Sequence, residues 1–101
     1  MDAIEREILM QARTRLATRK ASTVNWAICS SAASIAAACP STKSAVYAAC
    51  LRLCNRVCYA LGGQSYAAWV AHQLGVRHTS LDREKLRESR IAWLTYMLED
   101  C

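Results

Sequence analysis

A chain of 101 residues is the size of one domain, and such a domain buries only a modest share of its surface unless it dimerises. Its 13 lysines and arginines exceed its 8 acidic residues, and the net charge of +5 favours anionic partners. The alternative is a soluble surface that is cationic but binds no anionic partner. We expect no membrane span, because the least polar window, residues 24–39, is shorter than the roughly 20 residues that cross a bilayer. The acidic start lacks the features of a secretory signal, so a soluble cytoplasmic protein is predicted.

The first half of the chain predicts two helices. Over residues 3–20, Ile4, Ile8 and Leu16 recur on one side at the helical period, while basic residues lie on the other. Residues 24–39 contain few bulky side chains among alanines and serines. This composition favours a helix that packs closely against a neighbour.

A third helix is predicted over residues 41–61, because Pro40 suits a first helical turn and Gly62 with Gly63 suits a helix end. Its expected apolar arc contains Val46, Cys50, Leu53, Cys54, Val57, Cys58 and Leu61. The opposite face contains Ala45, Ala48, Ala49, Arg52, Asn55, Arg56 and Tyr59.

Two further helices are predicted over residues 65–74 and 80–99. Gly75 closes the first, and Thr79-Ser80-Leu81-Asp82 is typical of a helix start with a carboxylate near the positive end of the helix dipole. Because no strand pattern occurs, we expect a single all-α domain, as a helical hairpin or a small bundle.

The six cysteines raise the question of a metal site. Cys50, Cys54 and Cys58 rise along one helix by about 6 Å per step, so all three cannot reach one ion. Two of them with Cys39, His72 or His78 remain an alternative, but free thiols in a reducing cytosol are the favoured interpretation. No metal or cofactor is therefore predicted.

No catalytic constellation is predicted either. The sequence alone does not establish that an asparagine or aspartate lies beside His72 or His78, as a cysteine–histidine nucleophile site would need. Glu84 and Glu88 lie among arginines and lysines and are interpreted as a solvated salt-bridge face. We therefore expect a binding protein rather than an enzyme.

The polar face of the third helix is the candidate binding surface. Arg52 and Arg56 lie one turn apart, Asn55 and Tyr59 flank them, and the surrounding alanines leave a low surface. Such a face can donate hydrogen bonds to phosphates and 2′-hydroxyls. The predicted site also includes Lys43 on the same helix, and Arg19 and Lys20 from a second basic cluster that contains Arg13 and Arg15. Alternatively, the alanines mark a helix contact and the arginines extend to water.

Three runs between residues 40 and 90 carry a resemblance to a known family: Ala49-Cys50-Leu51, Ser65-Tyr66-Ala67-Ala68-Trp69-Val70 and Leu81-Asp82-Arg83-Glu84-Lys85-Leu86-Arg87. In these runs the chain resembles the RNA-silencing suppressors of nodaviruses. The resemblance implies a dimeric four-helix-type bundle that binds double-stranded RNA without reading its sequence. It matches Cys50 to a cysteine on the RNA-facing helix and Arg56 to a phosphate-binding arginine. The helical period places Cys50 and the arginines on different faces, so we assign the RNA face to the arginines.

The leading hypothesis is thus a homodimeric double-stranded RNA binder that shields RNA from host processing in the host cytoplasm. The first alternative is a helical adaptor or inhibitor of a host factor, such as a silencing protein, with the alanine-rich helices as its contact surface. The second is a helix-turn-helix DNA binder with its turn at Gly62 and Gly63. The helix after that turn, residues 65–74, has no arginine or lysine to contact a groove.

Overall fold

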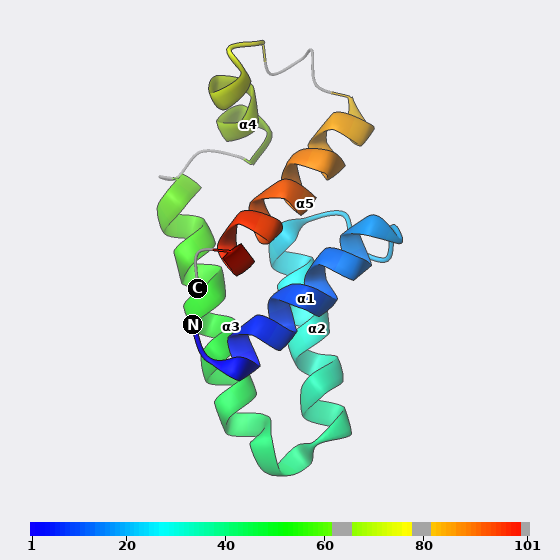
Figure 1. Ribbon diagram of the computed structural model, residues 1–101, viewed down its shortest axis with the longest axis vertical. Helices are drawn as coiled ribbons and strands as arrows, with labels where there is room; N and C mark the ends of the chain where they lie inside the picture. The colour runs from blue at the N-terminus through cyan, green and yellow to red at the C-terminus, as the bar shows by residue number, and fades with distance from the viewer. Residues whose placement is uncertain (62–65, 78–81, 100–101) are drawn as a thin grey trace.

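The computed structural model describes residues 1–61, 66–77 and 82–99. These residues form α1 (Ala3–Ala17), α2 (Val24–Ala38), the 3-10 turn η1 (Pro40–Thr42), α3 (Lys43–Leu61), α4 (Tyr66–Leu74) and α5 (Arg83–Glu99) (Figure 1). No strand occurs among them, which confirms the predicted all-α class. Within the same described residues, no helix is both long enough and apolar enough to cross a membrane.

Short polar side chains cap the helices at their N-termini. The Asp2 carboxylate accepts the Glu5 backbone N–H at 2.7 Å, and the Thr23 hydroxyl accepts the Trp26 N–H at 3.1 Å. The Asp82 carboxylate accepts the Lys85 N–H at 2.8 Å, so α5 begins three residues later than predicted. Such caps supply partners for backbone donors that the helix itself leaves unpaired. The predicted features at Gly62, Gly63, His78 and residues 79–81 lie outside the described residues.

The first helix ends three residues before its predicted end. Arg19 has a φ of 62°, in the left-handed region, and its N–H bonds to the Leu16 carbonyl at 3.2 Å. The Lys20 N–H bonds to the Arg15 carbonyl at 2.8 Å, which completes a left-handed helix cap. The cap turns the chain toward α2 and places Arg19 and Lys20 outside α1.

Helices α2 and α3 form an antiparallel hairpin through η1, and α1 packs on both of them (Figure 1). Helix α5 packs on α1, while α4 lies at one end of the molecule and contacts α5, where Trp69 stacks on Trp93 at 4.7 Å between ring centroids. Small side chains on α2 line the core: Ala27, Ala32 and Ala36. The larger core residues come from the other helices: Ile8, Leu9, Leu16, Val46, Leu53, Val57, Leu94 and Met97.

Two residues of α3 lie on the opposite side from the one predicted. Ala49 is fully buried although it was assigned to the polar face, and Cys58 is exposed although it was assigned to the apolar arc. The buried stripe runs through Val46, Ala49, Leu53 and Val57, at intervals of three or four residues. Cys58 follows Val57 by about 100° around the helix and so leaves this stripe.

Candidate nucleic-acid interface

The predicted polar face of α3 is exposed. The side chains of Arg52, Asn55, Arg56 and Tyr59 all reach solvent, and Tyr59 is 91% exposed. Arg52 and Arg56 lie about one turn apart on a helix of 19 residues, which is roughly 28 Å long. The structure therefore groups four of the predicted site residues on one side of one helix.

Arg52 also bonds to the start of α1. Its Nη2 donates to Asp2 Oδ2 at 3.0 Å and to Glu5 Oε1 at 3.3 Å. The pKa of the Asp2 carboxyl lies below its usual value, mainly because the carboxylate accepts the Glu5 backbone N–H, with a smaller contribution from the Arg52 charge. Arg52 and Asp2 are both about half exposed, so water and salt screen this pair.

Lys43 does not extend the Arg52 face. Nine residues separate the two, which is about two and a half helical turns, so their side chains leave α3 on opposite sides. Lys43 instead lies near Tyr47, with Nζ 6.0 Å from the ring centroid, at the outer limit of a cation–π contact. The helical period therefore places Lys43 away from the Arg52 face, and its role in RNA binding stays a prediction.

Cys50 is partly buried beside the core and contacts α2 rather than sharing the arginine face. This position agrees with the helical period and not with the RNA-facing position that the family resemblance implied. The arginines therefore remain the better candidates for contact with a polyanion.

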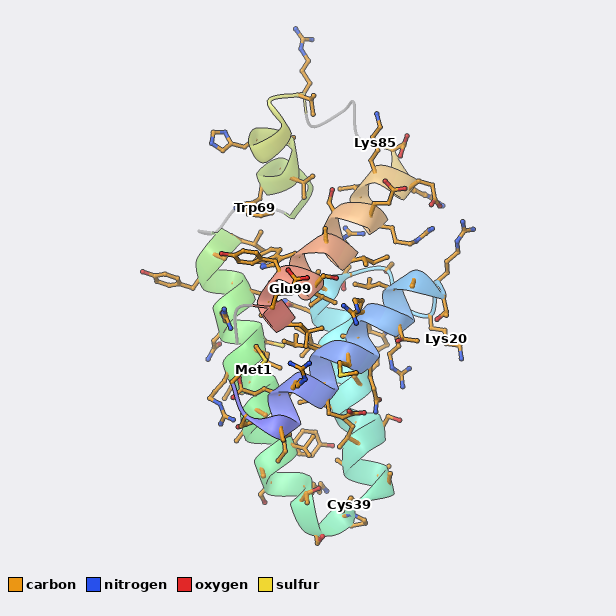
Figure 2. The ribbon with its side chains drawn as sticks, in the orientation of Figure 1. Met1, Lys20, Cys39, Trp69, Lys85 and Glu99 are labelled. Atoms are coloured by element: carbon orange, nitrogen blue, oxygen red, sulfur yellow. The ribbon has the colours of Figure 1, made fainter. Side chains whose placement is uncertain are left out.

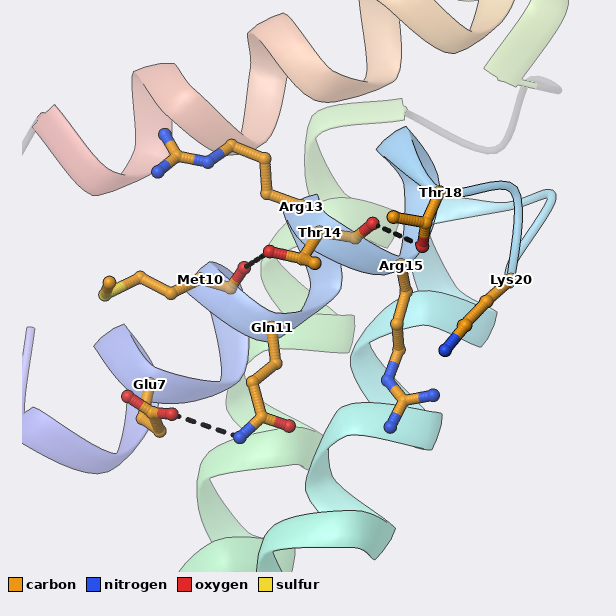
Figure 3. Close-up of a pocket in the computed structure, with 8 residues that line it drawn as sticks. All are labelled: Glu7, Met10, Gln11, Arg13, Thr14, Arg15, Thr18 and Lys20. Atoms are coloured by element: carbon orange, nitrogen blue, oxygen red, sulfur yellow. Dashed lines mark hydrogen bonds between the residues drawn. The ribbon is translucent and has the colours of Figure 1, made fainter.

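Lys20 lies across the molecule from α3 (Figure 2). It lines a shallow depression of about 420 Å³ on α1 with Glu7, Met10, Gln11, Arg13, Thr14, Arg15 and Thr18. Figure 3 shows Arg15 and Lys20 on one side of this depression and Arg13 directed toward α5, where its Nη1 donates to Thr95 Oγ1 at 3.2 Å. Within one protomer, Lys20 does not flank the face formed by Arg52 and Arg56.

Arg19 belongs to a third basic group that the sequence did not reveal. It lines a cavity of about 120 Å³ with three arginines of α5: Arg83, Arg87 and Arg90. Glu84 accepts from Arg19 at 2.9 Å and also from Arg87, while Arg90 donates to the Ser22 carbonyl. The spacing of the α5 arginines places them near one face, but the approach of Arg19 depends on tertiary packing.

Within the described residues, three cysteine side chains form a candidate metal site. The sulfur of Cys29 lies 4.0 Å from the sulfurs of both Cys50 and Cys54. Sequence reasoning considered Cys50 and Cys54 but missed Cys29 as their partner. Cys39, one of the considered partners, lies at the far end of the hairpin (Figure 2).

The chain matches no protein-family model, and no curated protein or solved structure is significantly similar to it. Its function is therefore inferred from the charges, exposure and geometry of its own residues.

Proposed function

We propose that this protein binds double-stranded RNA independently of sequence and shields it from host processing, as a viral suppressor of RNA silencing in the host cytoplasm. The observation that carries the proposal is the exposed face of α3, on which Arg52 and Arg56 lie one turn apart beside Asn55 and Tyr59. The resemblance to nodavirus suppressors between residues 40 and 90 adds support. The proposed role requires binding and no chemical step.

The shape of A-form RNA explains why such a face suits it. The minor groove of the duplex is wide and shallow and displays 2′-hydroxyls between two phosphate backbones. Ala45 and Ala48 are exposed on α3, and their small side chains allow the helix to lie close to this groove. Arginines donate to phosphates, and Asn55 and Tyr59 can donate to hydroxyls. These contacts do not read base edges.

Dimerisation is part of the proposal. One protomer offers one such helix, whereas two α2–α3 hairpins packed as a four-helix-type bundle offer two helices to one duplex. Apolar side chains are exposed on the hairpin: Trp26 is 60% exposed and Leu51 is 62% exposed. Burying such side chains in a homodimer would enlarge the small core of the single chain.

A protein adaptor is the second candidate, and the exposed Trp26 favours it because tryptophan is enriched at interface hot spots. However, only part of the expected contact surface is available, because Ala27, Ala32 and Ala36 of α2 are buried inside the chain. Three other alanines of α2 are exposed: Ala33, Ala37 and Ala38. The adaptor proposal predicts capture of a host or viral protein after nuclease treatment. A DNA-binding helix-turn-helix ranks last, because α4 contains no arginine or lysine.

The RNA proposal is tested by gel shift with a duplex of about 20 base pairs, at low salt and then at increasing salt. We expect binding to any sequence, and a steep loss of affinity as salt rises because phosphate contacts release counterions. Combining Arg52→Ala with Arg56→Ala should weaken binding about tenfold or more and reduce the salt dependence by about one unit of slope per lost phosphate contact.

The matched control combines Arg77→Ala with Lys85→Ala, which removes the same charge from two exposed residues away from α3. Circular dichroism should show unchanged helicity in both double variants. Absence of binding at low salt would overturn the proposed function. Equal weakening of RNA binding in the control variant would refute the assignment of the RNA-binding face to α3.

A further inference from the structure

The sulfur atoms of three cysteines from two helices lie close together. Cys29 comes from α2, and Cys50 and Cys54 lie four residues apart on α3, so both side chains project from the same side of that helix. Cys29 Sγ is 4.0 Å from Cys50 Sγ and 4.0 Å from Cys54 Sγ. All three sulfurs lie within 4.8 Å of one another.

The size of this triangle fits a metal ion. With two sides of 4.0 Å and a third of at most 4.8 Å, the point equidistant from the three sulfurs lies about 2.5 Å or less from each. A zinc–thiolate bond is about 2.3 Å long. An ion can therefore bind all three sulfurs after small side-chain shifts, without movement of the helices.

The surroundings favour a soft cation. Cys50 and Cys54 are partly buried against the core, whereas Cys29 is exposed and leaves a path from solvent. The group contains sulfur ligands and no carboxylate, which disfavours Mg²⁺ and Ca²⁺ and favours thiophilic ions.

We propose that Cys29, Cys50 and Cys54 bind one thiophilic d¹⁰ cation, Zn²⁺ or Cu⁺, as three thiolates. Each thiol releases its proton to solvent when its sulfur binds the ion. Three thiolates satisfy Cu⁺ in a trigonal arrangement, and Zn²⁺ takes a water molecule as its fourth ligand on the exposed side. The bound ion links α2 to α3 and stabilises the hairpin, independently of RNA binding.

The test uses the full chain with its thiols reduced, and titrates Zn²⁺ alone or Cu⁺ alone against a chromophoric chelator. We expect one ion per chain and a rise in the thermal unfolding midpoint on binding. Cys54→Ser should lower the affinity at least about tenfold, because it removes one ligand of three. Cys58→Ser is the matched control, since Cys58 lies one turn further along α3 and is exposed.

A second measurement needs no substitution and so does not depend on the folding of a variant. Alkylation followed by mass spectrometry should show that the ion protects Cys29, Cys50 and Cys54 and leaves Cys39 and Cys58 reactive. The proposal is overturned if neither ion binds at one per chain. It is also overturned if Cys58→Ser weakens binding as much as Cys54→Ser, or if the ion protects Cys39 and Cys58 as strongly as the three proposed ligands.

Discussion

Arg52 has two competing kinds of partner, the carboxylates of α1 and the proposed RNA phosphates. Its bonds to Asp2 and Glu5 both use Nη2, and the guanidinium has donors on two further nitrogens. These bonds hold the Arg52 side chain against the N-terminus of α1. The carboxylates also place two negative charges beside the proposed RNA face, where they repel phosphate.

Removing these charges should strengthen RNA binding. In a variant that combines Asp2→Asn with Glu5→Gln, we expect about two- to tenfold tighter binding at low salt, because Arg52 loses two opposing charges. Asparagine at position 2 retains the ability to cap α1. The measurement is a gel shift with duplex RNA across a salt series.

The control combines Glu88→Gln with Glu99→Gln, which removes the same charge from exposed positions on α5. A smaller effect in this control is expected, because Arg52 donates its hydrogen bonds to Asp2 and Glu5, and salt screens exposed charges that are not in direct contact with it. If the Asp2 and Glu5 variant binds RNA more weakly than the unmodified protein, the carboxylates do not compete with RNA for Arg52.

At the scale of the helix, the burial of Ala49 shows how closely α3 packs on its neighbours. Ala49 is fully buried and Ala48 is exposed, although the two are adjacent on α3. We expect Ala49→Leu to lower the free energy of unfolding by about 1–3 kcal/mol through overpacking. Ala48→Leu should change it by less than about 0.5 kcal/mol. Urea denaturation checks both values, and equal effects would contradict the observed orientation of α3.

Helix boundaries were largely predictable because local residues determine them. Pro40 and Gly75 interrupt the helical pattern, and the Thr23 hydroxyl caps the N-terminus of α2. The early end of α1 was not predictable, because it depends on a left-handed conformation at Arg19 that the residue type does not favour. The orientation of Ala49 was missed because small side chains fit either a core or a flat surface.

Contacts between helices could not be predicted from the sequence. The period of α3 was sufficient to group Arg52 with Arg56, and to separate both from Lys43. No pattern along the chain indicated that Cys29 would meet Cys50 and Cys54, because that meeting depends on the register of α2 against α3. The approach of Arg19 to the α5 arginines has the same origin, since it requires α5 to pack on α1.

For the molecule as a whole, the separation of the basic groups bears on how RNA would be bound. Lys20 and α3 lie on opposite sides of one protomer (Figure 2). The protomer measures 46 × 26 × 22 Å, and Lys20 lies at the opposite edge from α3, so Lys20 does not extend the face of Arg52 and Arg56 (Figure 2). A larger RNA contact therefore requires a second α3 helix, which a homodimer through the α2–α3 hairpin supplies.

The last prediction concerns this dimer. Leu51 is 62% exposed, so Leu51→Glu should leave the fold intact while it places a charge in the proposed interface. We expect the unmodified protein to have the mass of a dimer in solution, with and without duplex RNA, and the variant to be a monomer that binds RNA more weakly because it offers one α3 helix. Val76→Glu, at a residue 45% exposed beyond α4, is the matched control and should stay dimeric. Light scattering measures these masses, and an unmodified protein that binds RNA as a monomer would refute the dimer while leaving the RNA face of α3 in place.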